Sequence, residues 1–121
     1  MTTEATPLLD AMQIADLMAL DQGRGAVYAR FVEAFLSGAG ARMAQLKAHA
    51  GSADMPALAT AAHALMGSAG NIGAARLAAL FGRIEKAGKL EDLAAAQGLL
   101  ALLDAEFAAA REALLAAARK S

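Results

Sequence analysis

The sequence predicts an all-α fold, an up-down four-helix bundle preceded by a short additional N-terminal helix. The 121 residues are 58% hydrophobic but only 4% aromatic, because alanine, the strongest helix former, supplies much of the apolar share. Apolar residues recur with helical spacing in five segments, and no segment alternates with the period of two that marks a strand. We expect a single domain over residues 1–121, since this length is too short for two.

The first two helices are expected after a flexible N-terminal tail of residues 1–8. The short helix runs from about Leu9 to Leu20, and the turn Asp21-Gln22-Gly23 ends it, because glycine commonly follows a helix. A longer helix follows from about Gly25 to Ala50. Its predicted core residues are Val27, Phe31, Phe35, Met43 and Leu46. Two glycines inside this helix, Gly38 and Gly40, are expected to bend it, since each costs about 1 kcal/mol relative to alanine.

The third helix is preceded by the turn Gly51-Ser52-Ala53-Asp54, and we expect Asp54 to cap it. Pro56 falls in its first turn, where the missing N–H does no harm. The helix runs to about Gly70, and Asn71-Ile72-Gly73 breaks it. Its predicted core residues are Leu58, Ala62, Leu65 and Ala69.

The last two helices also carry apolar stripes. The fourth extends to Ala87-Gly88, and its predicted core residues are Leu77, Leu80, Phe81 and Ile84. The fifth runs from about Glu91 to Arg119, with Asp92 at its start. Its apolar residues are Leu93, Leu100, Leu103, Phe107, Leu114 and Leu115. Four long helices with short connections are typical of a bundle, and no heptad seam demands a dimer, so we expect a monomer.

Composition excludes several function classes. Eleven basic and twelve acidic residues leave a net charge of −1, so we expect no nucleic-acid partner, whose binding needs a basic surface. The absence of cysteine rules out disulfides and thiolate metal sites. The uncharged run Met55–Ala75 is long enough for a membrane span, but its proline, histidine, asparagine and three glycines argue against one. The N-terminus does not resemble a signal peptide, and we expect a cytoplasmic protein.

His63 stands in unusual surroundings. On a helix it lies about 100° around from Ala62, on the flank of the core stripe. Its neighbours one turn away are small or flexible, namely Ala59, Met66 and Gly67, and Gly70 lies one turn further on. The two glycines each weaken a helix by about 1 kcal/mol, which either close helix packing or the approach of another macromolecule would explain. A flat patch suits a macromolecular surface better than a small-molecule pocket, so we expect a partner to dock over this patch.

The segment His63-Ala64-Leu65-Met66-Gly67-Ser68-Ala69, followed by Ile72-Gly73-Ala74, resembles the motif of the histidine-containing phosphotransfer (HPt) domain of phosphorelays. Two further segments resemble this family, Phe31-Val32-Glu33-Ala34-Phe35-Leu36 and Leu77-Ala78-Ala79-Leu80-Phe81-Gly82-Arg83-Ile84-Glu85. The resemblance extends over about Leu9 to Leu115.

The resemblance implies a phosphoryl carrier of a two-component phosphorelay rather than an enzyme with turnover of its own. Nε2 of His63 would accept the group from a receiver-domain aspartate and pass it to another receiver. The implied partners are response-regulator receiver domains, one of a hybrid histidine kinase and one of a downstream regulator. Phosphoryl transfer depends mainly on placement and charge compensation. The receiver would bring the magnesium, so we expect no cofactor and no metal site in this chain.

The resemblance also implies supporting roles for three residues. Glu85 would accept the Nδ1–H of His63 and fix its tautomer, as orienting carboxylates do elsewhere. The alternative is an ordinary surface carboxylate paired with Lys89 at i+4. Ser68 would form a hydrogen bond or meet the approaching phosphate, and Gly67 would give clearance.

Met66 departs from the family motif, which has a lysine three residues after the histidine. Methionine cannot supply that positive charge, and the candidates to replace it are Arg83, Lys86 and Lys89. Met66 could instead enlarge an apolar docking patch, because methionine is adaptable at binding surfaces.

Three other functions stay open. A non-phosphorylated adaptor or inhibitor of the same fold would dock a histidine kinase or receiver. This alternative stays open because Met66 replaces the lysine of the family motif. In a purely structural helical bundle, His63 would be incidental. A small hydrolase is the most distant alternative, because Ser68 lacks a strained elbow and a readable base.

Overall fold

The computed structural model describes residues 6–22 and 24–119, which contain six α-helices, one 3₁₀ helix and no strand. This confirms the all-α class. The elements are α1 (Ala11–Met18), η2 (Ala19–Asp21), α2 (Ala26–Gly51), α3 (Met55–Ile72), α4 (Ala75–Lys89), α5 (Leu93–Leu100) and α6 (Leu103–Arg119).

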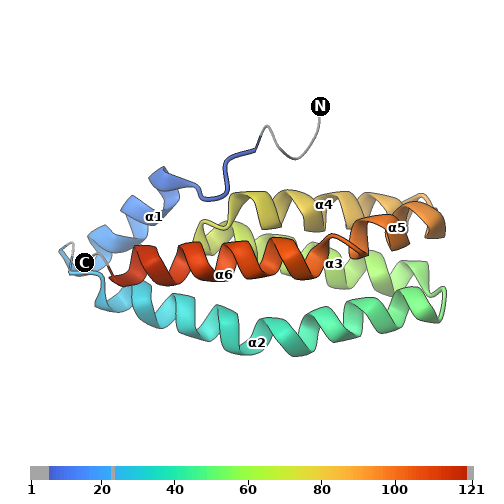
Figure 1. Ribbon diagram of the computed structural model, residues 1–121, viewed down its shortest axis with the longest axis horizontal. Helices are drawn as coiled ribbons and strands as arrows, with labels where there is room; N and C mark the ends of the chain where they lie inside the picture. The colour runs from blue at the N-terminus through green and yellow to red at the C-terminus, as the bar shows by residue number, and fades with distance from the viewer. Residues whose placement is uncertain (1–5, 23, 120–121) are drawn as a thin grey trace.

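Four helical segments form the bundle, namely α2, α3, α4 and the α5–α6 pair, which lie alongside one another. Helix α1 packs at one end of the bundle (Figure 1). The most extensive helix pair is α3 with α4. Between them the chain reverses at Gly73, whose φ of 88° ends α3 in the left-handed region. A Cβ on Gly73 would come within 2.6 Å of Cγ1 of Ile14, a residue of α1. Glycine is therefore required here by both the backbone conformation and the packing.

Helix starts follow the capping residues that the sequence predicts. The Asp54 carboxylate accepts from the backbone N–H of Ala57 at 3.2 Å, and the Asp92 carboxylate accepts from that of Ala95 at 3.0 Å. The long helix α2 has a different start. The side chain of Asp21 accepts the backbone N–H groups of Gly25 and Val27 across the preceding turn. These bonds satisfy donors that a helix start leaves unpaired.

The core runs along the centre of the bundle. The predicted stripes of the third and fourth helices are confirmed, because every one of their eight residues is at most 1% exposed: Leu58, Ala62, Leu65, Ala69, Leu77, Leu80, Phe81 and Ile84. Other large and fully buried side chains are Tyr28, Val32, Leu46, Leu103 and Leu114.

The core stripe of α2 differs from the prediction in its N-terminal half. Met43 and Leu46 are buried as expected, but Phe31 is 42% exposed, and Val27 and Phe35 are only half-buried. The interior positions are taken by the neighbouring residues Tyr28 and Val32. The Tyr28 hydroxyl donates to the carbonyl of Ile72 at 3.2 Å, and burial raises the pKa of Tyr28 to about 12. This bond ties α2 to the last turn of α3.

The expected fifth helix is interrupted. It divides into α5 and α6, which meet at an angle of 41° after the break at residues 101–102. α5 packs mainly on α4, whereas α6 packs on both α2 and α4, so the bend lets each segment follow different neighbours. Helix α2, in contrast, continues without a break through Gly38 and Gly40 and curves gently (Figure 1).

The last three residues of the expected tail, residues 6–8, contact the start of α4. Arg76 donates from Nε to the carbonyl of Thr6 at 3.2 Å and from its backbone N–H to the carbonyl of Leu8 at 3.3 Å. Residues 1–5 of that tail lie outside the described residues.

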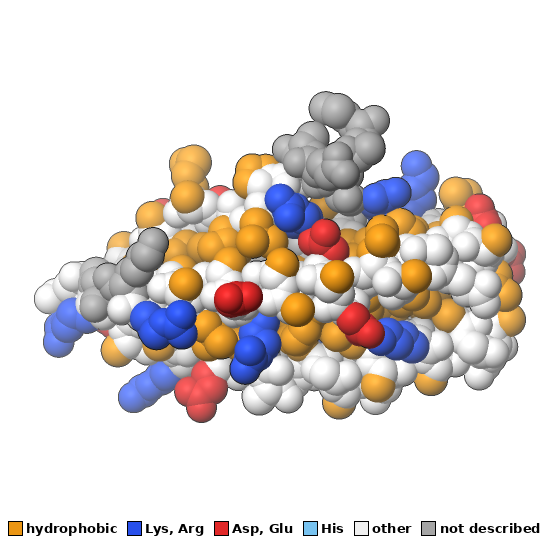
Figure 2. Space-filling model, in the orientation of Figure 1, with side chains coloured by type: hydrophobic (Ala, Val, Ile, Leu, Met, Phe, Trp, Pro, Cys, Tyr) orange, Lys and Arg blue, Asp and Glu red, His pale blue; other side chains and the backbone are white. Residues whose placement is uncertain are grey.

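The surface is mixed in charge. On the face in Figure 2, acidic and basic side chains are interspersed among apolar ones, and neither sign forms a continuous patch there. In the part of the chain that the structure describes, no single helix has the length and apolarity to cross a membrane. The bent α5–α6 pair meets that test when its two helices are taken together.

Candidate functional site

His63 projects from the middle of α3 on the side that faces α4. Its side chain is 67% exposed, so the ring stands in solvent rather than in the core. The interior side of the same helix turn is occupied by Ala62 and Leu65, which are both buried. The helix therefore presents the imidazole outward, as the spacing of the core stripe predicts.

Glu85 of α4 holds one nitrogen of this ring. Nδ1 of His63 and Oε2 of Glu85 are 3.0 Å apart. Nδ1–H donates in the tautomer that leaves the Nε2 lone pair free. The Glu85 side chain is only 11% exposed, so its position is fixed by packing. The contact that the resemblance implied is therefore present.

The alternative pairing of Glu85 is present as well. Nζ of Lys89 lies 3.0 Å from the same Oε2, one helical turn further along α4. The Lys89 hydrogen bond is the largest influence on the pKa of Glu85 and lowers it. Burial opposes this shift, and the His63 hydrogen bond adds to it, so the net pKa is lowered. Glu85 is consequently a carboxylate at neutral pH, shared between an imidazole and an ammonium group.

A shallow depression of about 310 Å³ surrounds these groups. It is lined by Ala59, Thr60, His63, Glu85 and Lys89. Ala59, which the sequence analysis places in the docking patch, is only 8% exposed. A Cβ on Gly88 would lie 3.0 Å from both Cβ and N of Ala59. The backbones of α3 and α4 therefore approach each other closely here, and Ala59 lies at the bottom of the depression.

The glycines beside the histidine leave open space. Gly67 and Gly70 are exposed, and a Cβ at either position would meet nothing within 4 Å. Close packing against another helix thus does not explain them.

The side chain of Met66 lies partly at the surface and partly against α4. It is half-buried, and a Cβ on Gly82 would lie 3.1 Å from its Sδ. The thioether therefore packs on α4, and only part of the side chain is available to a partner. Among the three candidate cations, Lys89 alone lines the depression at His63.

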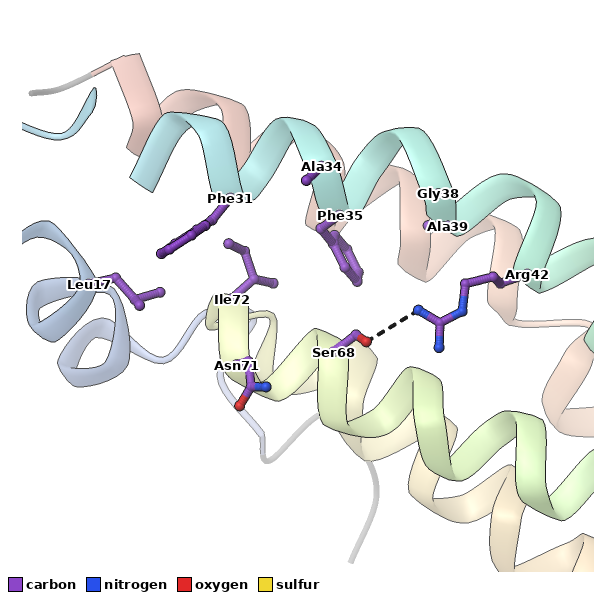
Figure 3. Close-up of a pocket in the computed structure, with 10 residues that line it drawn as sticks. All are labelled: Leu17, Phe31, Ala34, Phe35, Gly38, Ala39, Arg42, Ser68, Asn71 and Ile72. Atoms are coloured by element: carbon purple, nitrogen blue, oxygen red, sulfur yellow. Dashed lines mark hydrogen bonds between the residues drawn. The ribbon is translucent and has the colours of Figure 1, made fainter. Parts of the chain in front are cut away.

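Ser68 forms a hydrogen bond, which is one of the two roles that the resemblance implies, but its partner is a residue of α2 rather than His63. Five residues after His63, it points about 140° around the helix, toward α2. Its hydroxyl accepts from Nη1 of Arg42 at 3.3 Å, and both residues line a separate cleft (Figure 3). Ser68 is therefore not beside the ring. Arg42 is a functional candidate that sequence reasoning missed, since no pattern links it to α3.

Within the described ranges, no three His, Asp or Glu side chains come together in a way that could hold a metal ion.

Comparisons with known structures agree with the fold. The chain is similar to histidine-containing phosphotransfer protein B (HptB) from Pseudomonas aeruginosa PAO1, with a TM-score of 0.83, 24% identity, and coverage of 95% of this chain and 97% of that chain. It is also similar to histidine-containing phosphotransfer protein MtHPt2 from Medicago truncatula, with a TM-score of 0.79, 18% identity, and coverage of 93% and 80%. No curated protein matches the sequence.

The family model of the Hpt domain matches residues 30–113. This range holds most of the bundle, including His63 on α3 and Glu85 on α4. The chain belongs to the Hpt domain family.

Proposed function

We propose that His63 carries a phosphoryl group between the aspartates of two receiver domains. The observation that supports this proposal best is the combination of a ring that is 67% exposed with an Nδ1 held 3.0 Å from the Glu85 carboxylate. A ring that is both accessible and oriented can act as a nucleophile with little reorganisation.

The chemistry follows from the orientation of the ring. With Nδ1–H donated to Glu85, the Nε2 lone pair attacks the phosphorus of an aspartyl phosphate on the partner. An N–P bond forms, the P–O bond to the aspartate breaks, and the aspartate leaves as a carboxylate. The ring keeps its Nδ1 proton and becomes cationic, and the negative charge of Glu85 stabilises it. In the second transfer, an aspartate carboxylate of another receiver attacks the same phosphorus and Nε2 leaves.

Lys89 is the cation that this proposal assigns to the phosphoryl oxygens. Its ammonium group lies in the depression beside the ring, bonded to Glu85, and its side chain is 68% exposed. A flexible, exposed lysine can turn toward a phosphoryl group on Nε2 without leaving the depression. It would supply the charge that Met66 cannot.

The proposal leaves little other chemistry to this chain. The receiver would contribute the magnesium ion and the remaining groups that compensate charge. The chain would act as a carrier without turnover of its own, as a cytoplasmic monomer. Its partners would be the receiver of a hybrid histidine kinase and that of a downstream regulator.

One observation favours a second candidate function. Met66 replaces the lysine of the family motif, and its half-buried side chain packs on α4. A chain with a weakened phosphate site could instead dock a receiver or kinase and block it. The adaptor and the carrier share a surface but differ in whether His63 becomes labelled.

The test uses a set of receiver domains charged with radiolabelled acetyl phosphate and then mixed with this chain. We expect label on the wild type that is labile in acid and stable in base. His63→Gln should abolish the label, and the matched variant His49→Gln should keep it. Label that persists in His63→Gln, or no label with any receiver, would overturn the proposal. Binding without label would favour the adaptor.

A further inference from the structure

The depression at His63 extends toward the N-terminal end of α3. Its lining residues from α3 are Ala59, Thr60 and His63, and those from α4 are Glu85 and Lys89. Side chains on a helix lean toward its N-terminus, so the His63 ring is expected to lie over the turn that holds Ala59 and Thr60. A group attached to this ring would therefore share the depression with Thr60 of α3 and Lys89 of α4.

Thr60 is an unusual residue for this stretch of α3. Between Asp54 and Gly67 the only polar side chains are those of Thr60 and His63, and the other residues are alanine, leucine, methionine or proline. Threonine is a weaker helix former than alanine, so the stability of the helix does not explain its presence. Both polar side chains line the same depression.

The hydroxyl group of Thr60 is available to a ligand. The residue is exposed, and within residues 6–22 and 24–119 no group forms a hydrogen bond with this hydroxyl. A helical threonine often donates to the carbonyl three or four residues earlier, which here belongs to Ala57 or Pro56. Because the Thr60 hydroxyl makes neither bond, it can donate to a group that enters the depression.

Lys89 provides the other donor in the depression. Its Nζ lies 3.0 Å from Oε2 of Glu85, the oxygen that also contacts Nδ1 of His63. An ammonium group has three N–H donors, so Lys89 can bond Glu85 and a phosphoryl oxygen at the same time. A phosphoryl group has three strong acceptor oxygens. A hydroxyl group on the neighbouring helix would supply a donor to a second of these oxygens.

We propose that Thr60 is a phosphoryl-binding residue, whose hydroxyl donates a hydrogen bond to an oxygen of the group carried on Nε2 of His63. This proposal rests on the proposed function of His63. Thr60 and Lys89 would bind the phosphoryl dianion from two helices, α3 and α4, and both would act as donors toward its oxygens. Together they would supply the donors that Met66 cannot.

The test phosphorylates the full chain with phosphoramidate, so that no receiver domain is needed. The chain carries His49→Gln, which leaves His63 as its only histidine. Nε2 forms a bond to the phosphorus, the bond from phosphorus to the amide nitrogen breaks, and ammonia leaves. The ³¹P chemical shift then follows the protonation of the phosphoryl group as the pH is changed. A hydrogen bond donated to the dianion moves the midpoint of this titration to lower pH.

We expect the midpoint to lie at higher pH in Thr60→Val, which keeps the shape of the side chain and loses the hydroxyl. The protonation equilibrium should change about threefold to tenfold, as for the loss of a hydrogen bond to a charged group. Thr60→Ser keeps the hydroxyl and should restore the wild-type midpoint. Ala64→Val is the matched control, since Ala64 is exposed on α3 and does not line the depression. It should leave the midpoint unchanged.

An unchanged midpoint in Thr60→Val, or an equal change in Thr60→Ser, would overturn the proposal. A purely structural Thr60 would give the first of these results, because its loss would alter the free energy of unfolding and leave the phosphoryl group unaffected. The titration involves no receiver, so its failure would remove Thr60 from the site and leave the labelling of His63 by receivers as it stands. Receivers that never label His63 would overturn the relay instead, and they take no part in this measurement.

Discussion

Nδ1 of His63 and Oε2 of Glu85 lie 3.0 Å apart across the α3–α4 pair, although 22 residues separate them in sequence. The contact depends on how closely the two helices approach. Gly88 faces the backbone of Ala59, and Gly82 faces Met66. The small residues of α4 thus bring a buried carboxylate within hydrogen-bond distance of an exposed imidazole.

Removing the orienting carboxylate should slow phosphoryl transfer. Glu85→Ala leaves Nδ1 without an acceptor, and we expect a rate about 10–100-fold lower, the usual cost of losing a group that orients a functional histidine. Glu85→Gln keeps an acceptor oxygen but loses the charge that stabilises the cationic ring, so its loss of transfer rate should be smaller than that of Glu85→Ala. Single-turnover transfer from a charged receiver measures both. Equal losses in the two variants would mean that the charge of Glu85, rather than its hydrogen bond, matters.

The lowered pKa of Glu85 predicts a pH dependence of stability. The hydrogen bond from Lys89 is the main cause of the shift below the usual value of 4.5. The folded chain therefore binds fewer protons than the unfolded chain just below pH 4.5, and the contribution of Glu85 is lost as the pH falls through the folded-state pKa. Urea unfolding should show the wild type losing free energy more steeply than Glu85→Gln below pH 4.5. Parallel curves over the whole acid range would refute this linkage.

Gly67 should control access to the ring. A glutamine there would project into open space beside His63, one helical turn along. We expect Gly67→Gln to fold normally, because replacing a helical glycine removes a cost of up to about 1 kcal/mol, and to lower the transfer rate at least about tenfold. Gly98→Gln is the matched control, since Gly98 is also helical and exposed, and a Cβ there would also meet nothing within 4 Å. Normal transfer by Gly67→Gln would move the docking surface elsewhere.

Charge near the phosphoryl group should set the lifetime of the phosphohistidine. Met66→Lys adds a cation beside the ring, and we expect a lifetime about fivefold longer, because an exposed charge pair is worth about 1 kcal/mol. Lys89→Gln should shorten the lifetime, whereas Lys86→Gln, on the same helix but outside the depression, should not. Hydrolysis of the isolated phosphorylated chain measures all three. An unchanged lifetime in both Met66→Lys and Lys89→Gln would count against the charge argument.

The α3–α4 contact should tolerate a methyl group at one glycine and not at the other. At Gly88 the new Cβ would meet backbone atoms of Ala59 at 3.0–3.1 Å, whereas at Gly82 it would meet only the Sδ of Met66 at 3.1 Å. A thioether can move, but a helix backbone cannot move alone. We expect Gly88→Ala to lower the free energy of unfolding by about 1–3 kcal/mol and Gly82→Ala to leave it nearly unchanged. Denaturant unfolding that ranks the two variants the other way would contradict this packing.

The sequence predicts the parts of the fold that depend on local pattern. The core stripes of α3 and α4 and the capping aspartates Asp54 and Asp92 follow from spacing and capping chemistry, and the structure confirms them. The break between α5 and α6 could not be predicted, because residues 101–102 include no glycine or proline and the apolar pattern continues through them. Its cause is the packing of the two segments on different neighbours.

Within the candidate site, the contact between His63 and Glu85 was predicted from the resemblance alone, since spacing within one helix cannot reveal a residue of the next. The partner of Ser68 and the burial of Ala59 could not be predicted for a related reason. Helical angle places Ser68 on another side of α3, and the burial of Ala59 depends on how closely α4 approaches. Phe31 was expected in the core because it fits the stripe, but Tyr28 and Val32 take the interior positions.

The most direct test of the central claim identifies the atom that carries the phosphoryl group. The chain, with ¹⁵N-labelled histidine, is phosphorylated by a charged receiver, and its ring nitrogens are correlated with ³¹P by NMR. We predict one phosphorus bonded to Nε2 of His63, with the Nδ1 proton retained. Phosphorus on Nδ1 of His63, or on His49, would contradict the account, because Glu85 would then not be setting which nitrogen reacts.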